Sequence, residues 1–525
     1  MALTVVRSMA LVGLNGVPVE VEVDIAGGLP AFEIVGLPDA AVKEAKERVR
    51  AALRNAGYEL PPRRVTVNLA PAHLRKEGPA FDLAMAVGIL LASGQLDSGR
   101  KEKENGYTRL RDAVFIGELS LDGRVKPVNG VLPRVADGVA VGAELFCLPA
   151  ENACEGALVE GAEIFPARTL ADVVEGLLNP DRLMDVLAHR PRPLPADPSS
   201  LADEPDFAAV RGQAQARRAM EIAAAGGHNI LLIGPPGSGK TMLARCLPGI
   251  MPPLEWEEAL AVTRVYSVAG LLGNSPLVQR RPFRSPHHTT SRQAMVGGGR
   301  IPGPGEITLS NHGVLFLDEL PEFSRDVLES LRQPLEDGYV SVSRVQGNFV
   351  FPADNLLLVA AANPCPCGFH GDPEKECTCT PHQIQRYLGR ISGPLLDRID
   401  MHVEVPRLRY EELATREPGE NSAAIRKRVL MARRRQQERM QAAGLPKNRL
   451  NARLKPEEVL QFCQPDREGE NLLRQAFQRL NLSARGYHRL LKVARTIADL
   501  EGEEKVRAEH IAEALRYRVL DRYLP

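Results

Sequence analysis

The feature that most constrains this chain is the segment GPPGSGKT at Gly234–Thr241, which satisfies the pattern G-x-x-x-x-G-K-[ST] in full. It lies directly after the apolar run HNILLI and directly before a helical pattern, the context that confirms a phosphate-binding loop. Backbone N–H groups of such a loop curl around the β-phosphate of a nucleotide, and the N-terminus of the next helix adds its positive dipole end. The predicted nucleotide-binding residues are Gly234, Pro235, Pro236, Gly237, Ser238, Gly239, Lys240, Thr241 and Met242.

Two acidic residues at the end of a second apolar run complete this prediction. The run VLFLDEL, Val314–Leu320, carries Asp318 and Glu319 at its end. We expect Lys240 to contact the β- and γ-phosphates, and Thr241 and Asp318 to hold Mg²⁺. Glu319 can orient or deprotonate an attacking water. Two acids after so apolar a run favour a site over a solvated strand end, so the predicted cofactors are ATP and Mg²⁺.

Length and charge set limits on the rest of the molecule. The chain has 525 residues, too many for one hydrophobic core, and its 44% hydrophobic and 25% charged residues are typical of a globular protein. Lys and Arg number 66 and Asp and Glu also number 66, so a nucleic-acid partner would need a local basic surface. The start lacks the pattern of a secretory signal, and the apolar stretch at 81–94 is too short to span a bilayer. We therefore expect a cytoplasmic protein without a membrane partner.

The sequence predicts an α/β multidomain protein with three parts. Residues 189–206, rich in Pro, Ser and Asp, form a linker. Residues 1–188 mix strands and helices as an α+β domain: Val17–Ile25 alternates as a half-exposed strand, and a helical stripe follows before Gly57. That stripe contains Val42, Ala45, Val49, Leu53 and Ala56. Residues 207–410 contain continuous apolar strands typical of a parallel sheet, and residues 411–525 are helical.

Four cysteines lie close together after one of these strands. Cys365, Cys367, Cys377 and Cys379 form the pattern C-x-C-x₉-C-x-C. In a reducing compartment such clusters hold metal more often than they form disulfides, and four thiolates close a tetrahedral zinc shell without an open position for a catalytic water. We therefore predict structural Zn²⁺. Because C-x-C is tighter than the usual spacing, His370 and His382 are alternative ligands, and free thiols or redox-linked pairs are the alternative to metal.

These motifs resemble those of the AAA+ ATPases. The resemblance implies that Asn363 is sensor 1, which places the lytic water, and that Arg398 in GPLLDRID is the arginine finger for the ATP of a neighbouring subunit. It also implies that Arg485 is sensor 2, although Arg489 lies one turn away and could compete. Arg332 is a secondary candidate near the subunit junction. A finger supplied in trans implies a ring.

Two inserts resemble elements of the magnesium-chelatase and replicative-helicase branch of this superfamily, where they project toward a central pore. They lie at 280–313 and 339–355, and the second reads as a hairpin. Arginines interleaved with Phe283 and Tyr339 suit phosphates and stacked bases, whereas pairing across subunits is the alternative. The candidate DNA contacts are Arg281, Arg284, Arg292, Arg300 and Arg344.

The full chain resembles the ComM/YifB family of magnesium-chelatase-like AAA+ proteins. Its N-terminal part, through GPAFDLAMAVGILLASG and FIGELSLDGRVKPVNGVLPRV, resembles the Lon-type proteolytic domain, which has the ribosomal S5 domain 2-like fold. Ala80 and Leu132 occupy the places of the protease's serine and lysine, and Lys126 cannot replace a missing serine. Without these groups there is no serine–lysine chemistry, so we expect a role in ring assembly or substrate contact.

The resemblance implies an ATP-driven, ring-forming DNA motor. Its partner would be single-stranded or branched DNA, and its activity that of a hexameric helicase promoting branch migration in recombination or natural transformation. Alternatives are a magnesium-chelatase-type motor for metal insertion into a tetrapyrrole and an AAA+ protein remodeler. In the C-terminal part, which resembles an AAA+ lid, the basic run Ile425–Arg439 is either a solvated helix face or a DNA-facing helix.

Overall fold

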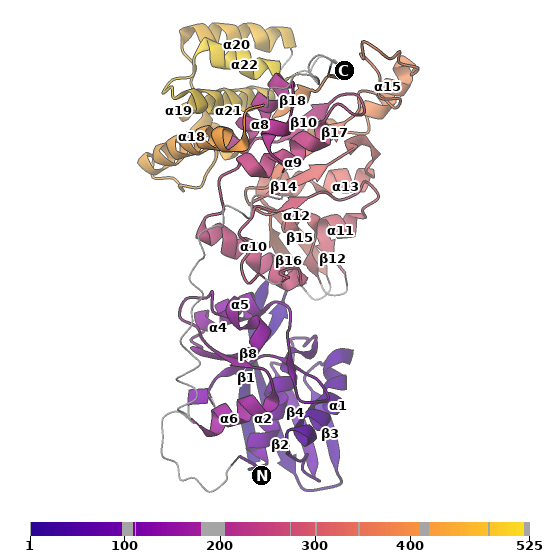
Figure 1. Ribbon diagram of the computed structural model, residues 1–525, viewed down its shortest axis with the longest axis vertical. Coiled ribbons are helices and arrows are strands. Elements are labelled where there is room, and N and C mark those ends of the chain that lie inside the picture. The colour runs from indigo at the N-terminus through magenta and orange to yellow at the C-terminus, as the bar shows by residue number, and fades with distance from the viewer. Residues whose placement is uncertain are drawn as a thin grey trace. The chain divides into compact units, whose positions relative to one another are not determined.

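The computed structural model describes residues 2–96, 109–110, 112–179, 205–273, 275–299, 302–344, 347–408, 419–480 and 483–518. Most of the predicted linker, 189–204, and Arg300 lie outside these ranges. The chain divides into two compact units (Figure 1). The first consists of Met1–Pro195 and Ala259–Val278, and the second of Ala196–Glu258 and Gln279–Pro525. Residues 259–278, which the sequence places within the central domain, therefore pack with the N-terminal part.

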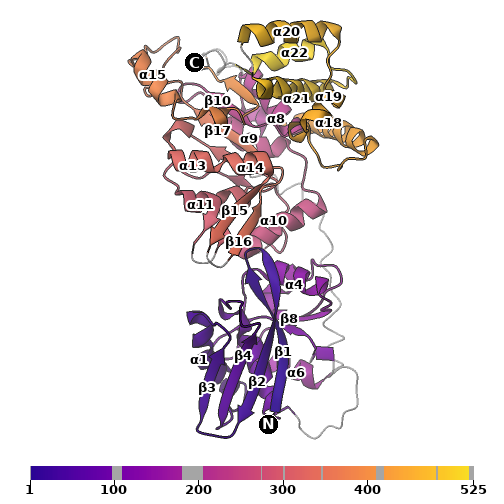
Figure 2. The same ribbon diagram turned by 180° about the vertical axis from the view of Figure 1, so that it is seen from behind.

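The first unit is built on a seven-stranded sheet with the order β3-β4-β2-β1-β5-β8-β9. Four of these strands lie side by side in Figure 2, with β1 and β2 forming a long antiparallel hairpin. The strands are β1 (Ala2–Val12), β2 (Asn15–Ala26), β3 (Ala31–Val35), β4 (Arg64–Ala70), β5 (Val114–Phe115), β8 (Leu145–Pro149) and β9 (Glu163–Ala167). The helices that pack with them are α1 (Ala40–Asn55), α2 (Asp82–Ala92), α4 (Val131–Ala140) and α6 (Leu170–Leu178).

Local patterns in this unit agree with the sequence. Along β2 the side chains alternate as predicted, with Val21 and Val23 fully buried. Four of the five predicted stripe residues are buried in α1, and Ala56, directly after the helix, is half-buried. Asp39 caps the first turn, and Gly57 follows in the left-handed conformation that glycine adopts without strain.

The two residues expected at the places of the protease's catalytic pair are part of the hydrophobic core. Ala80 is 2% exposed and Leu132, in α4, is 4% exposed. Lys126 ends the short strand β7 (Val125–Lys126) and its side chain is exposed. Two buried hydrocarbon side chains offer neither a nucleophile nor a base, so these two positions cannot supply serine–lysine chemistry.

The second unit contains a five-stranded parallel sheet with the order β11-β14-β17-β10-β18. Its strands are β10 (Ile230–Ile233), β11 (Phe283–Arg284), β14 (Val314–Leu317), β17 (Leu357–Ala362) and β18 (Met401–Glu404). Strands β14 and β17 are buried along their whole length, as expected for a parallel sheet covered on both faces. Carboxyl ends of parallel strands meet at one edge, so the residues that follow β11, β14, β17 and β10 are brought together there.

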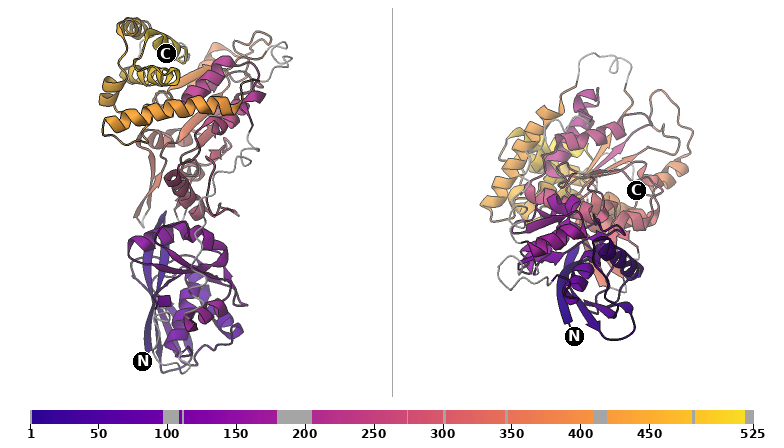
Figure 3. Two further views of the ribbon diagram at one scale, coloured as in Figure 1. Left: turned by 60° about the vertical axis from the view of Figure 1, so that its left-hand side comes forward. Right: turned by 60° about the horizontal axis from the view of Figure 1, so that its bottom comes forward.

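The C-terminal part is helical, as predicted. It contains α18 (Ser422–Ala442), α19 (Pro456–Phe462), α20 (Arg467–Leu480), α21 (Ala484–Glu501) and α22 (Ala508–Arg516). Helix α18 is the long orange helix in the left view of Figure 3. The predicted hairpin is also present, as the antiparallel pair β15 (Tyr339–Arg344) and β16 (Gly347–Pro352). None of the described helices combines the length and apolar composition that a membrane span requires.

Candidate functional site

The phosphate loop connects β10 to α9 (Lys240–Ile250). A Cβ atom at Gly234 would lie 2.0 Å from the carbonyl oxygen of Val405, so no larger residue fits there. Gly239, directly before the helix, has φ +92°, a conformation that other residues rarely adopt. These glycines let the backbone turn tightly before the N-terminus of α9, which is where phosphate groups bind.

Lys240 is a buried cation held only by neutral oxygens. Its Nζ donates to the carbonyl oxygens of Gly234 (2.7 Å) and Pro235 (2.9 Å), and to Oδ1 of Asn363 at 3.3 Å. Burial lowers the pKa of Lys240 to about 8, an effect larger than the opposing attraction of nearby carboxylates. A cation in this position fits the phosphates of a nucleotide, whose oxygens would replace these weaker acceptors.

The residues predicted to hold magnesium lie in contact. Thr241 Oγ1 donates to Asp318 Oδ2 at 2.8 Å, and Asp318 Oδ1 accepts from the backbone N–H of Glu319 at 3.0 Å. A hydroxyl and a carboxylate placed together in this way suit the oxygen shell of Mg²⁺. Together with the contact between Lys240 and Asn363, this brings side chains after three neighbouring strands to one edge of the sheet.

Glu319 has a partner that sequence reasoning missed. Its backbone is left-handed, with φ +53°, a strained conformation for a non-glycine residue. Its Oε2 lies 3.3 Å from Nδ1 of His288, whose ring packs on that of His287 with centroids 4.0 Å apart. The two histidines follow β11, which neighbours β14. The sequence contains the dipeptide, but only the strand order shows that it meets the acidic pair.

The two arginines predicted to act on nucleotide are grouped around one carboxylate. Arg398 forms an ion pair with Glu336 and donates to the carbonyl oxygen of Pro394 at 2.7 Å. The hydrogen bond from Arg398 is the main reason that the pKa of Glu336 is lowered, and Arg485 and Arg332 add to the effect. Among the described residues, Arg485 makes no contact with the phosphate loop of its own chain.

Arg489, the alternative to Arg485, has a different position. Its Nε lies 3.6 Å from Oδ1 of the buried Asp400. Burial lowers its pKa, so it is a partly desolvated ion-pair partner. Arg485 is exposed and is therefore the better placed of the two for a phosphate outside its own chain.

Burial and ion pairing argue against the prediction that Arg281 contacts DNA. Arg281 is 8% exposed, pairs with Glu258 at 2.8 Å, and donates to the carbonyl oxygens of Pro252 and His312. Buried charges are retained where they are paired, and this arginine joins three segments of the core. These partners occupy its guanidinium, so its main role is to hold the fold.

The other predicted DNA contacts differ in their exposure and in their ion pairing. Arg284 forms a bidentate pair with Glu306, at 2.7 and 2.8 Å, and is half-buried. Arg292 begins α11 (Arg292–Val296) and is exposed. Arg344 ends β15, is exposed, and has a backbone carbonyl as its hydrogen-bond partner. Of these three, Arg292 and Arg344 remain candidates.

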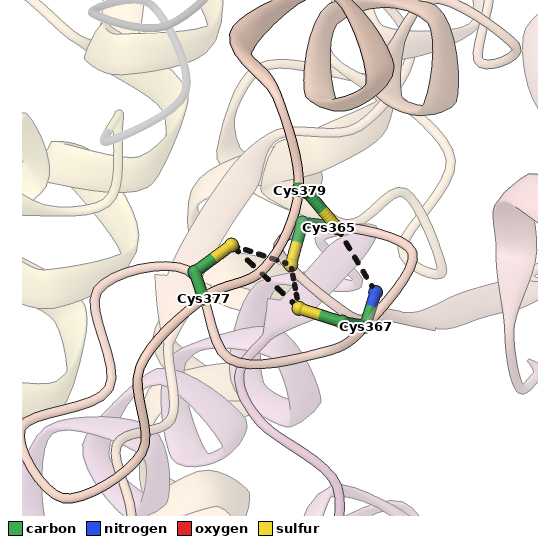
Figure 4. A group of neighbouring side chains, drawn as sticks. All are labelled: Cys365, Cys367, Cys377 and Cys379. Carbon is green, nitrogen blue, oxygen red and sulfur yellow. Dashed lines mark hydrogen bonds between the residues drawn. The ribbon is translucent and has the colours of Figure 1, made fainter.

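The four cysteines converge on one point (Figure 4). The Sγ atom of Cys365 lies 3.3 Å from that of Cys367 and 3.7 Å from that of Cys377, and all four sulfurs lie within 4.8 Å of one another. Sulfurs around tetrahedral zinc are about 3.8 Å apart, given Zn–S bonds of about 2.3 Å. The backbone N–H of Phe369 is the main cause that lowers the pKa of Cys367 to about 5. The cluster can therefore hold a metal ion, and its metal-ligand group contains neither His370 nor His382.

The cysteine loop also touches the phosphate loop. Gly368, between two of the cysteines, has φ +87°, and a Cβ there would lie 2.6 Å from Cδ of Pro236. The two loops are thus packed as closely as a glycine allows. Any shift of the cysteine loop would therefore displace the backbone of the phosphate loop.

These features define the second unit as an AAA+ domain of the magnesium-chelatase type. Three family models match the chain: "Magnesium chelatase, subunit ChlI" at residues 206–413, "Subunit ChlI of Mg-chelatase" at 21–152, and "Magnesium chelatase, subunit ChlI C-terminal" at 419–518. YifB of Escherichia coli (strain K12) is 43% identical over 100% of this chain and 98% of its own length. The competence protein ComM of Haemophilus influenzae is 45% identical over 100% and 99%. The chain belongs to the YifB/ComM family of magnesium-chelatase-like proteins.

Similarity to proteases is confined to part of the molecule. Lon protease 2 of Bacillus subtilis is 26% identical over 194 residues, which is 33% of this chain and 33% of the protease. Both family resemblances predicted from the sequence are confirmed.

Because His288 contacts Glu319, we expect ATP turnover to depend on it. His288→Ala should lower kcat roughly tenfold and leave KM for ATP within about twofold, since the contact orients the acid without touching the phosphates. His288→Asn keeps an N–H donor near the position of Nδ1 and should recover most of kcat. Steady-state ATPase assays check this, with the exposed His382→Ala as control. A raised KM with unchanged kcat would assign His288 to substrate binding instead.

Proposed function

We propose that this protein hydrolyses ATP at junctions between subunits of a ring and uses the energy to move along DNA. The observation that carries the proposal is the convergence of Lys240, Thr241, Asp318 and Asn363 at one sheet edge, with Glu319 beside them. In this proposal Lys240 neutralises the β- and γ-phosphates, while Thr241 and Asp318 hold magnesium. Bound ATP and Mg²⁺ supply the scissile phosphate bond and the Lewis acid.

Hydrolysis also needs a correctly positioned water molecule and positive groups that compensate the negative charge developing on the phosphate in the transition state. Glu319 accepts a proton from the water, and Asn363 helps place it. Arg398 and Arg485, which both act on the carboxylate of Glu336, serve a neighbouring subunit in this proposal. When the neighbouring subunit binds ATP, Arg398 would leave Glu336 and bind the phosphate oxygens instead, so its position would depend on the nucleotide state of that subunit.

DNA is the proposed partner and branch migration the proposed activity. Support comes from the full-length similarity to a competence protein, ComM, and from the exposed Arg292 and Arg344 on the two inserts. Arginine contacts to phosphates are independent of base sequence, which is what translocation along DNA needs. The ring is proposed to be a hexamer.

A second candidate follows from the names of the family models, all of which describe a magnesium-chelatase subunit. In that case the same ATPase would drive metal insertion into a tetrapyrrole with the help of other proteins. The two candidates differ in the macromolecule that stimulates ATP turnover, so a DNA-dependence assay separates them.

We expect branched DNA to stimulate the ATPase of the purified protein several-fold and three-stranded branch substrates to be resolved in the presence of ATP. Glu319→Gln should still bind ATP and DNA but resolve no substrate, because the water is no longer activated. Gel assays of strand products and a coupled ATPase assay measure both. Equal turnover with and without every DNA form tested would reject the DNA motor and favour the second candidate.

Mixed rings test the proposed junction. Arg398→Ala should lower turnover at least about 100-fold, because it removes the finger from the next site. Lys240→Ala should also be inactive, but it carries an intact finger. Mixing the two variants should restore part of the activity. At some junctions the intact ATP site of an Arg398→Ala subunit would then meet the intact Arg398 of a Lys240→Ala subunit. Arg474→Ala, which removes an exposed arginine of α20, is the control. Absence of complementation would contradict catalysis between subunits.

Zinc is proposed for the cysteine cluster. Metal analysis should find about one zinc per chain, and Cys377→Ser should lose it. Because Gly368 packs on Pro236, the same variant should raise KM for ATP by roughly fivefold or more. Cys154→Ser, an exposed cysteine of the first unit, should change neither. Full zinc content in Cys377→Ser would remove this cysteine from the ligand set.

A further inference from the structure

The basic run of α18 is divided between two functions. Four of its seven cations are bound within the protein: Arg426 to the carbonyl of Gly249, Arg428 to Glu221 and Glu420, Arg435 to the carbonyl of Asp499, and Arg439 to Asp499 itself. These contacts attach α18 to α8 (Ala214–Gly226), α9 and α21. The other three, Lys427, Arg433 and Arg434, line one pocket, and Arg433 is also bound within the protein, to the carbonyl of Ala224.

This pocket has a volume of about 520 Å³ and lies in the second unit. One wall is α18, and the others are formed by residues 252–258 and 447–450. The volume is in the range of small-ligand sites and would hold one or two nucleotides of a flexible strand. A DNA duplex is too thick to enter it.

The charge of the pocket is unbalanced. Its cations are Arg281, Lys427, Arg433, Arg434, Lys447 and Arg449, and its acids are Glu255 and Glu258. Both acids are already engaged, Glu258 with Arg281 at 2.8 Å and Glu255 with Lys447 at 3.8 Å. Arg449 is paired with Glu458, and Arg434 with Glu438 on the exposed surface.

Arg433 is the pocket cation that burial affects most strongly. Its guanidinium donates twice to the carbonyl oxygen of Ala224 and has no carboxylate partner among the described residues. Burial, and then repulsion by Arg281, lower the pKa of Arg433 to about 9. Lys427 has no hydrogen bond or ion pair with any described residue. Glu258 and Glu255 attract Arg433, but this effect is smaller than that of burial, and cations that are only partly compensated are stabilised when a phosphate binds.

The exposed face of α18 combines these charges with apolar surface. Lys427, Leu430, Met431 and Arg434 follow the spacing i, i+3, i+4, i+7 and so share one face of the helix. Leu430 is 42% and Met431 44% exposed, which is unusual for side chains of this size on a charged helix. Trp256, 38% exposed, directly follows the lining residue Glu255. Phosphate-binding cations beside apolar and aromatic groups are the chemistry of single-strand binding.

We propose that this pocket binds a short segment of a single DNA strand, with backbone phosphates on Lys427, Arg434 and Arg433 and bases against Leu430 and Met431. The proposal rests on the proposed DNA motor and adds a site to it. The site lies outside the two inserts, on the helix that joins the nucleotide-binding core to the helical C-terminal part.

The test uses the full-length protein and the double variant Lys427→Ala/Arg434→Ala, both of whose side chains are exposed. Its affinity for a labelled oligothymidylate should fall roughly tenfold or more. The slope of log affinity against log salt should decrease by about 1.4, or about 0.7 for each lost phosphate contact to a single strand. Fluorescence of Trp256, the single tryptophan of the chain, should change on oligothymidylate binding in the wild type and much less in the variant.

A matched control removes two other exposed arginines, Arg474→Ala/Arg507→Ala, and should bind oligothymidylate like the wild type. Unchanged affinity in the pocket variant, with a wild type that binds, would overturn this site and leave the DNA motor intact. A wild type that binds no DNA would overturn both. Loss of ring assembly with normal DNA binding per ring would overturn the site and assign it to an acidic segment of a neighbouring subunit. A change in Trp256 fluorescence on addition of tripolyphosphate, with no change on addition of oligothymidylate, would overturn the site in favour of a free polyphosphate.

Discussion

The buried ammonium group of Lys240 is the interaction on which the nucleotide site depends. Lowering its pKa from its ordinary value of 10.5 to about 8 corresponds to a cost on the order of 3 kcal/mol for keeping it charged. Neutral carbonyl and amide oxygens offset only part of that cost, whereas phosphate oxygens would offset it fully. The parallel sheet makes this arrangement possible, since it places Thr241, Asp318 and Asn363 after neighbouring strands at the same edge.

What the sequence predicts well is whatever depends on spacing along the chain. The phosphate loop, the strand with Asp318, the helix stripe of α1 and the four cysteines are all fixed within short segments, and the structure contains them as expected. The contact of His288 with Glu319 was missed because it depends on β11 lying next to β14, which no local pattern reveals. Arg281 was misread for the same reason: its partner Glu258 is 23 residues away in the chain.

Charge balance within the chain explains which arginines are available. The whole molecule carries equal numbers of acids and bases, so net charge says nothing about a binding surface. The partner of each arginine shows instead whether its charge is available for a ligand. Arg281 and Arg284 have acids of their own and hold the fold, whereas the hydrogen-bond partners of Arg344 and Arg433 within the described ranges are backbone carbonyls. Arginines bound only to carbonyls can bind a phosphate backbone favourably, whereas arginines already paired with an acid contribute little to such binding.

In the proposed ring, with Arg398 as the finger, coupling between one ATP site and the next would have a physical route through Asn229. This residue directly precedes β10, whose other end carries the phosphate loop. Its Nδ2 donates to the carbonyl oxygen of Arg398, its Oδ1 accepts from the N–H of Leu358 in β17, and its own N–H donates to Asp400. The finger segment is therefore fixed to the strands that carry Lys240 and Asn363. A displacement of either strand on nucleotide binding would shift the backbone of Arg398, because packed strands and their hydrogen bonds move as a unit.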